Sequence, residues 1–188
     1  MLEFHYNSEK TIESISYLLS KAEGSKMEII RLIKMLYFAD REALKEYNFP
    51  ITGDSFASLP YGPIVSKTYN NIKKNVELPS LFNDYLIRED RWIQLKKEKA
   101  IKKLSEAEIE ILDEVFHKYI HYTVAQLIDY CHNSSLVPEW RDPGSSSIPI
   151  DIEDLLVFLN KTQDEIKSIK ESLKEHNEIT SFLSKYEP

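Results

Sequence analysis

The second half of the chain contains histidines and a cysteine of the kinds that bind metal ions. His117 and His121 are spaced so that one helix would present both imidazoles on the same face, and Cys131 and His132 follow further along. Imidazole and thiolate are ligands that zinc prefers. Structural zinc sites take four such ligands, however, and the chain has one cysteine and no H-E-x-x-H motif. The pattern favours ordinary polar roles, and we predict neither a metal site nor a cofactor.

Carboxylates near the middle of the chain could supply acid–base chemistry. Asp40 stands beside Arg41 in an apolar stretch, and Asp54 directly follows Gly53. Two carboxylates whose pKa values are driven apart by their surroundings can act as acid and base. Alternatively, these groups are buried and paired beneath a turn, because buried charges persist only with partners. We favour this structural role.

Other catalytic patterns are missing from the sequence. The segment 52–54 (TGD) is not followed by Lys-Ser or Lys-Thr, so it does not form a phosphate-binding loop. No G-x-S-x-G nucleophile motif occurs. Cys131 and His132 are adjacent, so a helix would point their side chains in different directions. The sequence therefore predicts no enzymatic activity, and a hydrolase or metalloprotein would rest on the histidines alone.

The elements that must position these side chains are mainly helical. Helix-type apolar spacing predicts a first helix that starts at Asn7 or Ser8 and stops at Gly24, and a second from about Ser25 to Tyr47. Later helix starts are indicated by N-terminal signals, namely Pro63 in a first turn, Ser105 with Glu108, Thr123, and Asp151 or Asp154.

Short alternating runs predict a few strands beside the helices. One is residues 55–59, and another is a hairpin over 84–96 in which Tyr85, Ile87 and either Trp92 or Ile93 point inward. The expected fold class is mainly α (α+β), almost all-α, with six to seven helices and a small antiparallel β-sheet or hairpin.

The end of the chain differs in composition from the rest. Residues 133–149 are rich in Ser and Pro and are predicted to be a linker. Beyond them a charged helix carries a narrow apolar stripe, which is typical of a helix that docks by one edge or binds a partner. The stripe consists of Ile166, Ile169, Leu173, Ile179 and Leu183.

Composition limits the possible surroundings and partners. The 188 residues suffice for one domain with a core, and the net charge of −7 disfavours a nucleic-acid binder, which normally carries a basic face. One cysteine cannot form an internal disulfide, which fits a reducing compartment. The sequence has neither a signal-peptide pattern nor an apolar run long enough to cross a bilayer. We therefore expect a cytoplasmic protein without a membrane partner.

Three segments together resemble the Panacea domain of SocA-like antitoxins, which belong to bacterial and phage toxin–antitoxin pairs. They are residues 34–41 (KMLYFADR), 50–54 (PITGD) and 61–63 (YGP). The second half is similar to the family's C-terminal signature at Leu104-Ser-Glu, Tyr119-x-His121, Leu127, His132 and Glu139-Trp140. The resemblance covers roughly residues 10–142, so we expect a domain at 1–142, followed by a linker and helical extension at 143–188 that packs on the domain or on a partner.

The resemblance implies structural roles for the family motif. The matching positions are Tyr37, Asp40, Arg41, Gly53, Asp54, Tyr61, Gly62, Pro63, His121, His132 and Trp140. It also implies a compact, mostly helical domain with a small antiparallel sheet and no enzymatic activity.

The resemblance further implies a partner, since proteins of this family bind and neutralise a toxin that is usually encoded beside them. Some act instead as adaptors that deliver the toxin to a protease such as a ClpXP-type machine. Our candidates for partner contact are Asp54, Phe56, Tyr61, Tyr69, Ile166, Ile169 and Leu173, with core packing as the alternative for Phe56. A DNA-binding regulator from a phage or mobile element without a toxin partner is the alternative function, and a homodimer stays open.

Overall fold

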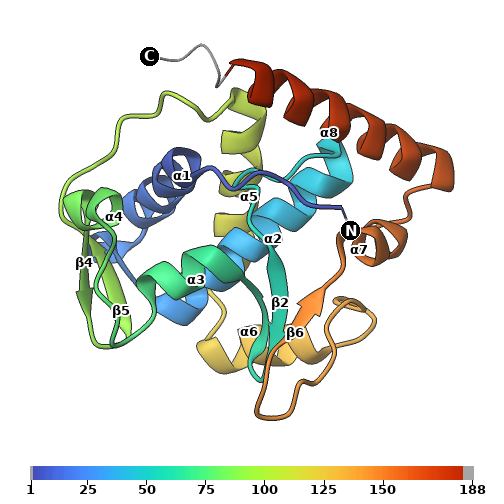
Figure 1. Cartoon of the computed structure of the whole chain (residues 1–188). Coiled ribbons are helices and arrows are strands. Elements are labelled where there is room, and N and C mark those ends of the chain that lie inside the picture. Colours follow the sequence, from blue (N-terminus) through green and yellow to red (C-terminus); the bar gives the residue numbers. More distant parts are fainter. Residues whose placement is uncertain (1, 184–188) are drawn as a thin grey trace.

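A computed structural model describes residues 2–183 of the chain and the side chains of residues 2–175. This part holds eight α-helices and two three-stranded antiparallel sheets (Figure 1). The predicted mainly α (α+β) class is confirmed. The chain is less nearly all-α than expected, because it has two sheets, and the helices outnumber the six to seven predicted.

The helices follow one another with short strands between them. They are α1 (Ser8–Lys21), α2 (Ile29–Tyr47), α3 (Ser66–Ile72), α4 (Ser80–Tyr85), α5 (Glu106–Tyr119), α6 (Val124–His132), α7 (Ile152–Phe158) and α8 (Gln163–Leu183). One sheet has the order β1 (Lys26–Glu28), β5 (Trp92–Leu95), β4 (Leu86–Glu89). The other has the order β3 (Gly62–Val65), β2 (Phe56–Leu59), β6 (Ile148–Ile150).

Helix α2 runs through the middle of the molecule, and other elements cover all but its last turn (Figure 1). Every residue from Leu32 to Asp40 is buried, including the polar Lys34, Tyr37 and Asp40. A helix that is buried all round normally carries only apolar side chains. The polar side chains of α2 must therefore find hydrogen-bond partners inside the protein.

Capping side chains set the helix starts that the sequence predicted. Asn7 Oδ1 accepts a hydrogen bond from the Lys10 amide at the start of α1. Ser105 and Thr123 each form a complete capping box, and Asp151 caps α7. These predictions are confirmed, since each side chain satisfies backbone amides that the first helical turn leaves free.

The first helix ends at Lys21 rather than Gly24, which lies in a short 3-10 helix. Two predicted helix starts are wrong because a strand takes their place. The second helix begins at Ile29 rather than Ser25, since Lys26–Glu28 form β1 and pair with β5. Pro63 lies in β3, opposite Ser58, and not in the first turn of a helix. Because β3 is an edge strand, the missing amide hydrogen of proline is tolerated there.

The predicted hairpin exists, but one strand presents its other face to the core. Leu86 and Ile93 are buried, whereas Ile87 is 42% exposed. Successive strand residues point to opposite sides, so an error of one position in the inward set reverses the assignment.

The residues predicted to form a linker and an extension pack against the rest of the chain. Val137 and Glu139 are buried, β6 pairs with β2, and α8 lies over the end of α2 (Figure 1). Ile166, Ile169 and Leu173 belong to the same hydrophobic core. The side chains of Ile179 and Leu183 lie outside the described residues, and the domain boundary at residue 142 stays a prediction.

The N-terminal segment crosses the turn that precedes β2. The Asn7 amide donates to the Thr52 carbonyl over 2.9 Å. Gly53 has a φ of 66°, and a Cβ atom there would lie 2.1 Å from the His5 carbonyl oxygen. Only glycine fits both the left-handed backbone and this close approach.

We expect Gly53→Ala to lower the free energy of unfolding by about 3 kcal/mol, because backbone strain and the clash with His5 add. The matched control is Gly144→Ala, since Gly144 has a φ of 58° but open space around it. That variant should lose only about 1 kcal/mol. Urea unfolding followed by circular dichroism measures both. Equal losses would mean that the N-terminal segment does not pack on this turn in solution.

Candidate functional site

Two buried aspartates organise the turn between α2 and β2. Asp40 Oδ1 accepts a hydrogen bond from the Thr52 amide over 2.8 Å, and Asp40 Oδ2 accepts one from the Thr52 hydroxyl. Asp54 caps the start of α3, since its oxygens accept from the Lys67 and Thr68 amides over 2.9 and 2.8 Å. The Asp54 amide in turn donates to Thr52 Oγ1 over 3.1 Å. Both carboxylates hold backbone, and neither faces solvent.

Burial changes the acidity of Asp40. The pKa of this carboxyl is raised from 3.8 to about 7, chiefly by desolvation. The nearby Asp54 also raises this pKa, and the hydrogen bonds from Thr52 lower it. A raised pKa is one mark of a catalytic acid. Asp40 is fully buried, however, so no substrate can reach its proton from solvent. The structural role that the sequence favoured matches this geometry.

A second buried polar cluster joins α2 to the segment after α6. Glu139, whose side chain is fully buried, accepts hydrogen bonds from Arg41 Nε over 2.6 Å and from the Tyr37 hydroxyl. Desolvation raises the pKa of Tyr37, and the adjacent Glu139 raises it too, so the phenol keeps its proton. Arg41 also donates to the Leu136 carbonyl over 3.3 Å.

Side chains from three elements brace the turn that connects β2 and β3. Lys34 Nζ on α2 donates to the Pro63 carbonyl over 2.7 Å. Trp140 Nε1 donates to the Leu59 carbonyl, and the Pro60 carbonyl accepts from His132 Nε2, both over 3.0 Å. The His132 and Trp140 rings stack with centroids 4.1 Å apart. The turn is therefore held from several sides.

Tyr61 is the motif residue at the tip of this braced turn. Its side chain is 64% exposed, the largest exposure of any large hydrophobic residue among the described side chains. Next to it, a Cβ atom on Gly62 would lie 2.5 Å from Cys131 Cβ and 2.9 Å from Lys34 Nζ. The backbone thus packs directly on the core, while the tyrosine ring projects into solvent.

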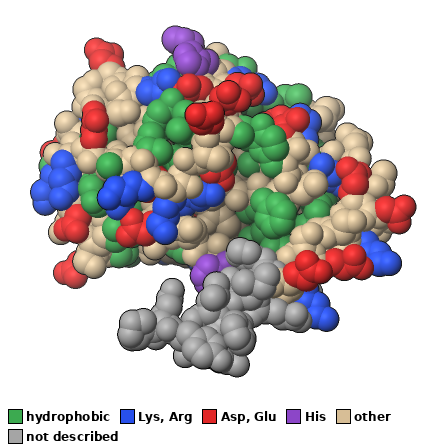
Figure 2. Space-filling view, turned by 90° about the horizontal axis from the view of Figure 1, so that it is seen from above, with side chains coloured by type: hydrophobic (Ala, Val, Ile, Leu, Met, Phe, Trp, Pro, Cys, Tyr) green, Lys and Arg blue, Asp and Glu red, His purple; other side chains and the backbone are tan. Residues whose placement is uncertain are grey.

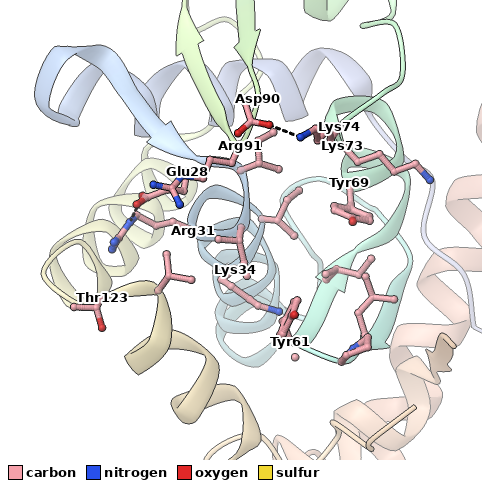
Figure 3. Close-up of a pocket in the computed structure, with 18 residues that line it drawn as sticks. Glu28, Arg31, Lys34, Tyr61, Tyr69, Lys73, Lys74, Asp90, Arg91 and Thr123 are labelled. Carbon is pink, nitrogen blue, oxygen red and sulfur yellow. Dashed lines mark hydrogen bonds and ion pairs between the residues drawn. The ribbon is translucent and has the colours of Figure 1, made fainter. Parts of the chain in front are cut away.

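A groove of about 730 Å³ opens beside Tyr61 (Figure 3). Its walls come from the first half of α2, the β2–β3 turn, the end of α3, the β4–β5 turn and the start of α6. Ile30, Ile33 and Ile64 supply apolar surface, and Tyr69 adds an aromatic ring. This volume lies within the range of sites that bind small molecules or anchoring side chains.

Lys34 is the buried ammonium of this groove. In Figure 3 its side chain runs from α2 toward Tyr61. Desolvation lowers the pKa of Lys34 from 10.5 to about 8, while Cys131 acts weakly in the opposite direction. Burial raises the pKa of the Cys131 thiol to about 11, so the sulfur is a protonated core group and not an activated nucleophile.

The structure brings together only some of the predicted contact residues. Tyr61 and Tyr69 both line the groove. The other candidates are buried in the core, so they cannot form a contact surface while the domain stays folded, and we withdraw them as contact residues. They are Asp54, Phe56, Ile166, Ile169 and Leu173.

The histidines do not converge on one point. His117 Nδ1 bonds the Asp113 carbonyl of its own helix over 2.7 Å, His132 is part of the turn brace, and His121 is exposed. Among the described side chains, no group of three or more His, Cys, Asp or Glu residues is placed to share a metal ion. None of the helices described combines the length and hydrophobicity needed to cross a bilayer.

Sequence reasoning assigned no role to several residues that prove central. In the sequence, Lys34 and Glu139 stand out only as part of the family motif, and Thr68 has no distinguishing signal. The position of Lys34 inside an apolar helical stretch indicates a buried charge, which must find a partner. Glu139 and Thr68 lie far along the chain from their partners, and nothing local predicts those contacts.

The fold and site define a small α+β domain in which side chains of a polar motif brace one exposed turn beside a groove. The chain belongs to the family described as antitoxin SocA-like, Panacea domain, whose model matches residues 32–141. This agrees with the resemblance carried by the three motif segments. Comparison with curated proteins and with solved structures gave no match.

The raised pKa of Asp40 predicts a specific dependence of stability on pH. The native state keeps this proton up to about pH 7, whereas the unfolded chain releases it near its ordinary value of 3.8. The native state therefore gains stability from protonated Asp40 at low pH and loses it as the pH rises toward 7. In Asp40→Asn, the decrease in the free energy of unfolding over this pH range should be smaller by on the order of 2 kcal/mol. Urea unfolding of both proteins between pH 4.5 and 8 measures the difference, and parallel curves would contradict it.

Removing the cation beside Glu139 should destabilise the fold. Arg41→Met leaves a fully buried carboxylate without its ion pair, which is expected to lower the free energy of unfolding by about 3 kcal/mol. Adding Glu139→Gln should recover part of this loss, because the neutral amide needs no counter-charge. The control Lys45→Gln breaks an exposed ion pair with Glu42 on the same helix and should change stability by less than about 0.5 kcal/mol. A similar small change in Arg41→Met would contradict the role assigned to this pair.

Proposed function

We propose that this protein neutralises a toxin protein by binding it directly, and that Tyr61 and the adjoining groove form the contact surface. Membership of the antitoxin family supports the role. The observation that carries the choice of surface is the braced turn, which presents an exposed tyrosine on a backbone that is held by Lys34, His132 and Trp140.

The physical properties of this turn suit a protein interface. Tyrosine is among the residues that most often dominate binding energy, especially when it stands beside a concave apolar surface. A braced turn loses little conformational entropy on binding, so more of the interaction energy is realised as affinity. Tyr61 meets both conditions.

We also propose that the protein has no enzymatic activity of its own. The candidate acids and bases are engaged in internal hydrogen bonds, as Asp40, Asp54 and Glu139 illustrate. The Cys131 thiol is fully buried with a raised pKa. These assignments support a protein that acts through binding alone, in a cytoplasmic setting.

A regulator that binds DNA and has no toxin partner is less well supported. The chain carries a net charge of −7, and the face in Figure 2 shows acidic and basic side chains interspersed among apolar ones. DNA binding requires clustered cations that displace counterions from the phosphates. A gel-shift assay with the DNA upstream of the gene tests this alternative.

The first experiment is growth rescue with the neighbouring open reading frame. That frame is expressed alone and together with this chain, and the complex is recovered through a tag on one partner. The proposal expects toxicity alone, growth with both chains and recovery of a complex. Immunoblots of toxin levels with and without ClpXP distinguish direct inhibition from delivery to a protease. Light scattering shows whether the chain is a homodimer. A harmless neighbour, or rescue without binding, would contradict the proposal.

Tyr61→Ala should abolish growth rescue and weaken toxin binding at least tenfold, because it removes the anchoring ring without touching the core. Its melting temperature should change by less than about 2 °C, since the side chain lies mostly in solvent. Tyr47→Ala is the matched control, because Tyr47 is 50% exposed and lies at the end of α2, away from the groove. Equal binding by both variants would remove Tyr61 from the contact surface.

A further inference from the structure

The groove beside Tyr61 carries an excess of positive charge in an otherwise acidic protein. Five cationic and two anionic side chains line it. Each carboxylate is paired within the groove, Glu28 with Arg31 over 3.1 Å and Asp90 with Lys74 over 2.5 Å. Three cations therefore have no carboxylate at ion-pair distance among the described residues, namely Lys34, Lys73 and Arg91.

The three cations lie at different depths. Lys34 is buried at the Tyr61 end, where it has a single hydrogen bond, to the Pro63 carbonyl. Arg91 stands at the β4–β5 turn, and Lys73 extends outward from the end of α3, beside the Tyr69 ring at 5.9 Å (Figure 3). The cationic side chains therefore lie at separate places along the groove, with Lys73 at its outer rim, where its Nζ donates to Asn70 Oδ1 over 2.8 Å.

Burial of Lys34 carries an energetic cost, although its hydrogen bond to the Pro63 carbonyl braces the turn. Removing an ammonium from water is unfavourable, and the depressed pKa of Lys34 reports that penalty. A buried ammonium that borders an open groove is a common feature of binding sites. The same low-dielectric wall that penalises the free ammonium strengthens its attraction for an incoming anion.

Deepening the proposed function, on which this inference rests, we propose that the groove binds an acidic segment of the toxin. An aliphatic or aromatic side chain of that segment packs between Ile30, Ile33 and Ile64, and neighbouring carboxylates face the positive rim. The apolar walls favour a peptide over a nucleic acid, because nucleic-acid surfaces are lined by phosphates and need broad polar contact.

The test uses a library of random peptides displayed on phage, selected against the full chain. Selected peptides should combine acidic residues with an aliphatic or aromatic residue. The best of them, made synthetically, should bind at least tenfold more weakly to the double variant Lys73→Gln/Arg91→Gln, and its affinity should fall as salt is raised. The control Lys102→Gln/Lys103→Gln removes the same charge from exposed positions outside the groove and should bind as the wild type does.

Three results would overturn the inference. They are selection of peptides without acidic residues, equal binding by the two double variants, and no enrichment of any peptide. Tighter binding of a single-stranded DNA oligonucleotide than of the best peptide would assign the groove to nucleic acid instead. Growth rescue is scored separately from peptide binding. If rescue succeeds and the groove binds no acidic peptide, the toxin docks elsewhere. Acidic-peptide binding without rescue means that the groove serves another partner.

Discussion

Burial of the middle of α2, from Leu32 to Asp40, is the constraint on which the rest of the structure depends. This helix carries Lys34, Tyr37, Asp40 and Arg41 into or along the core, and an unpaired polar group there would cost several kcal/mol. Three parts of the chain satisfy these four side chains: β3 for Lys34, the segment after α6 for Tyr37 and Arg41, and the turn before β2 for Asp40. The central helix thus organises the fold through hydrogen bonds as well as through apolar contact.

The same constraint connects stability to the surface that we propose for binding. Lys34 reaches the Pro63 carbonyl, so a residue of the buried helix helps to hold the turn that presents Tyr61. His132 and Trp140 hold the other side of that turn. These motif residues therefore fix the backbone conformation of the turn that carries the exposed Tyr61.

Local chemistry made much of the secondary structure predictable. Helix starts depend on side chains within three residues, so Asn7, Ser105 and Thr123 were identifiable from sequence alone. The strand at Lys26–Glu28 was not, since three residues without clear alternation become a strand only by pairing with β5. Pro63 was misassigned for a similar reason, because whether a proline opens a helix or lies in an edge strand depends on the neighbouring strand.

The sequence by itself determined the family, the α+β class and the absence of recognisable catalytic motifs, since these follow from residue types and their spacing along the chain. Only the tertiary structure decided which motif residues are reachable. Asp54, Phe56 and the described stripe residues of α8 (Ile166, Ile169 and Leu173) are buried, while Tyr61 is exposed beside a positive groove. The physical reason is that burial and net local charge depend on residues far apart in sequence. Lys34 and Arg91, for example, line the same groove, and no local sequence pattern encodes that they do.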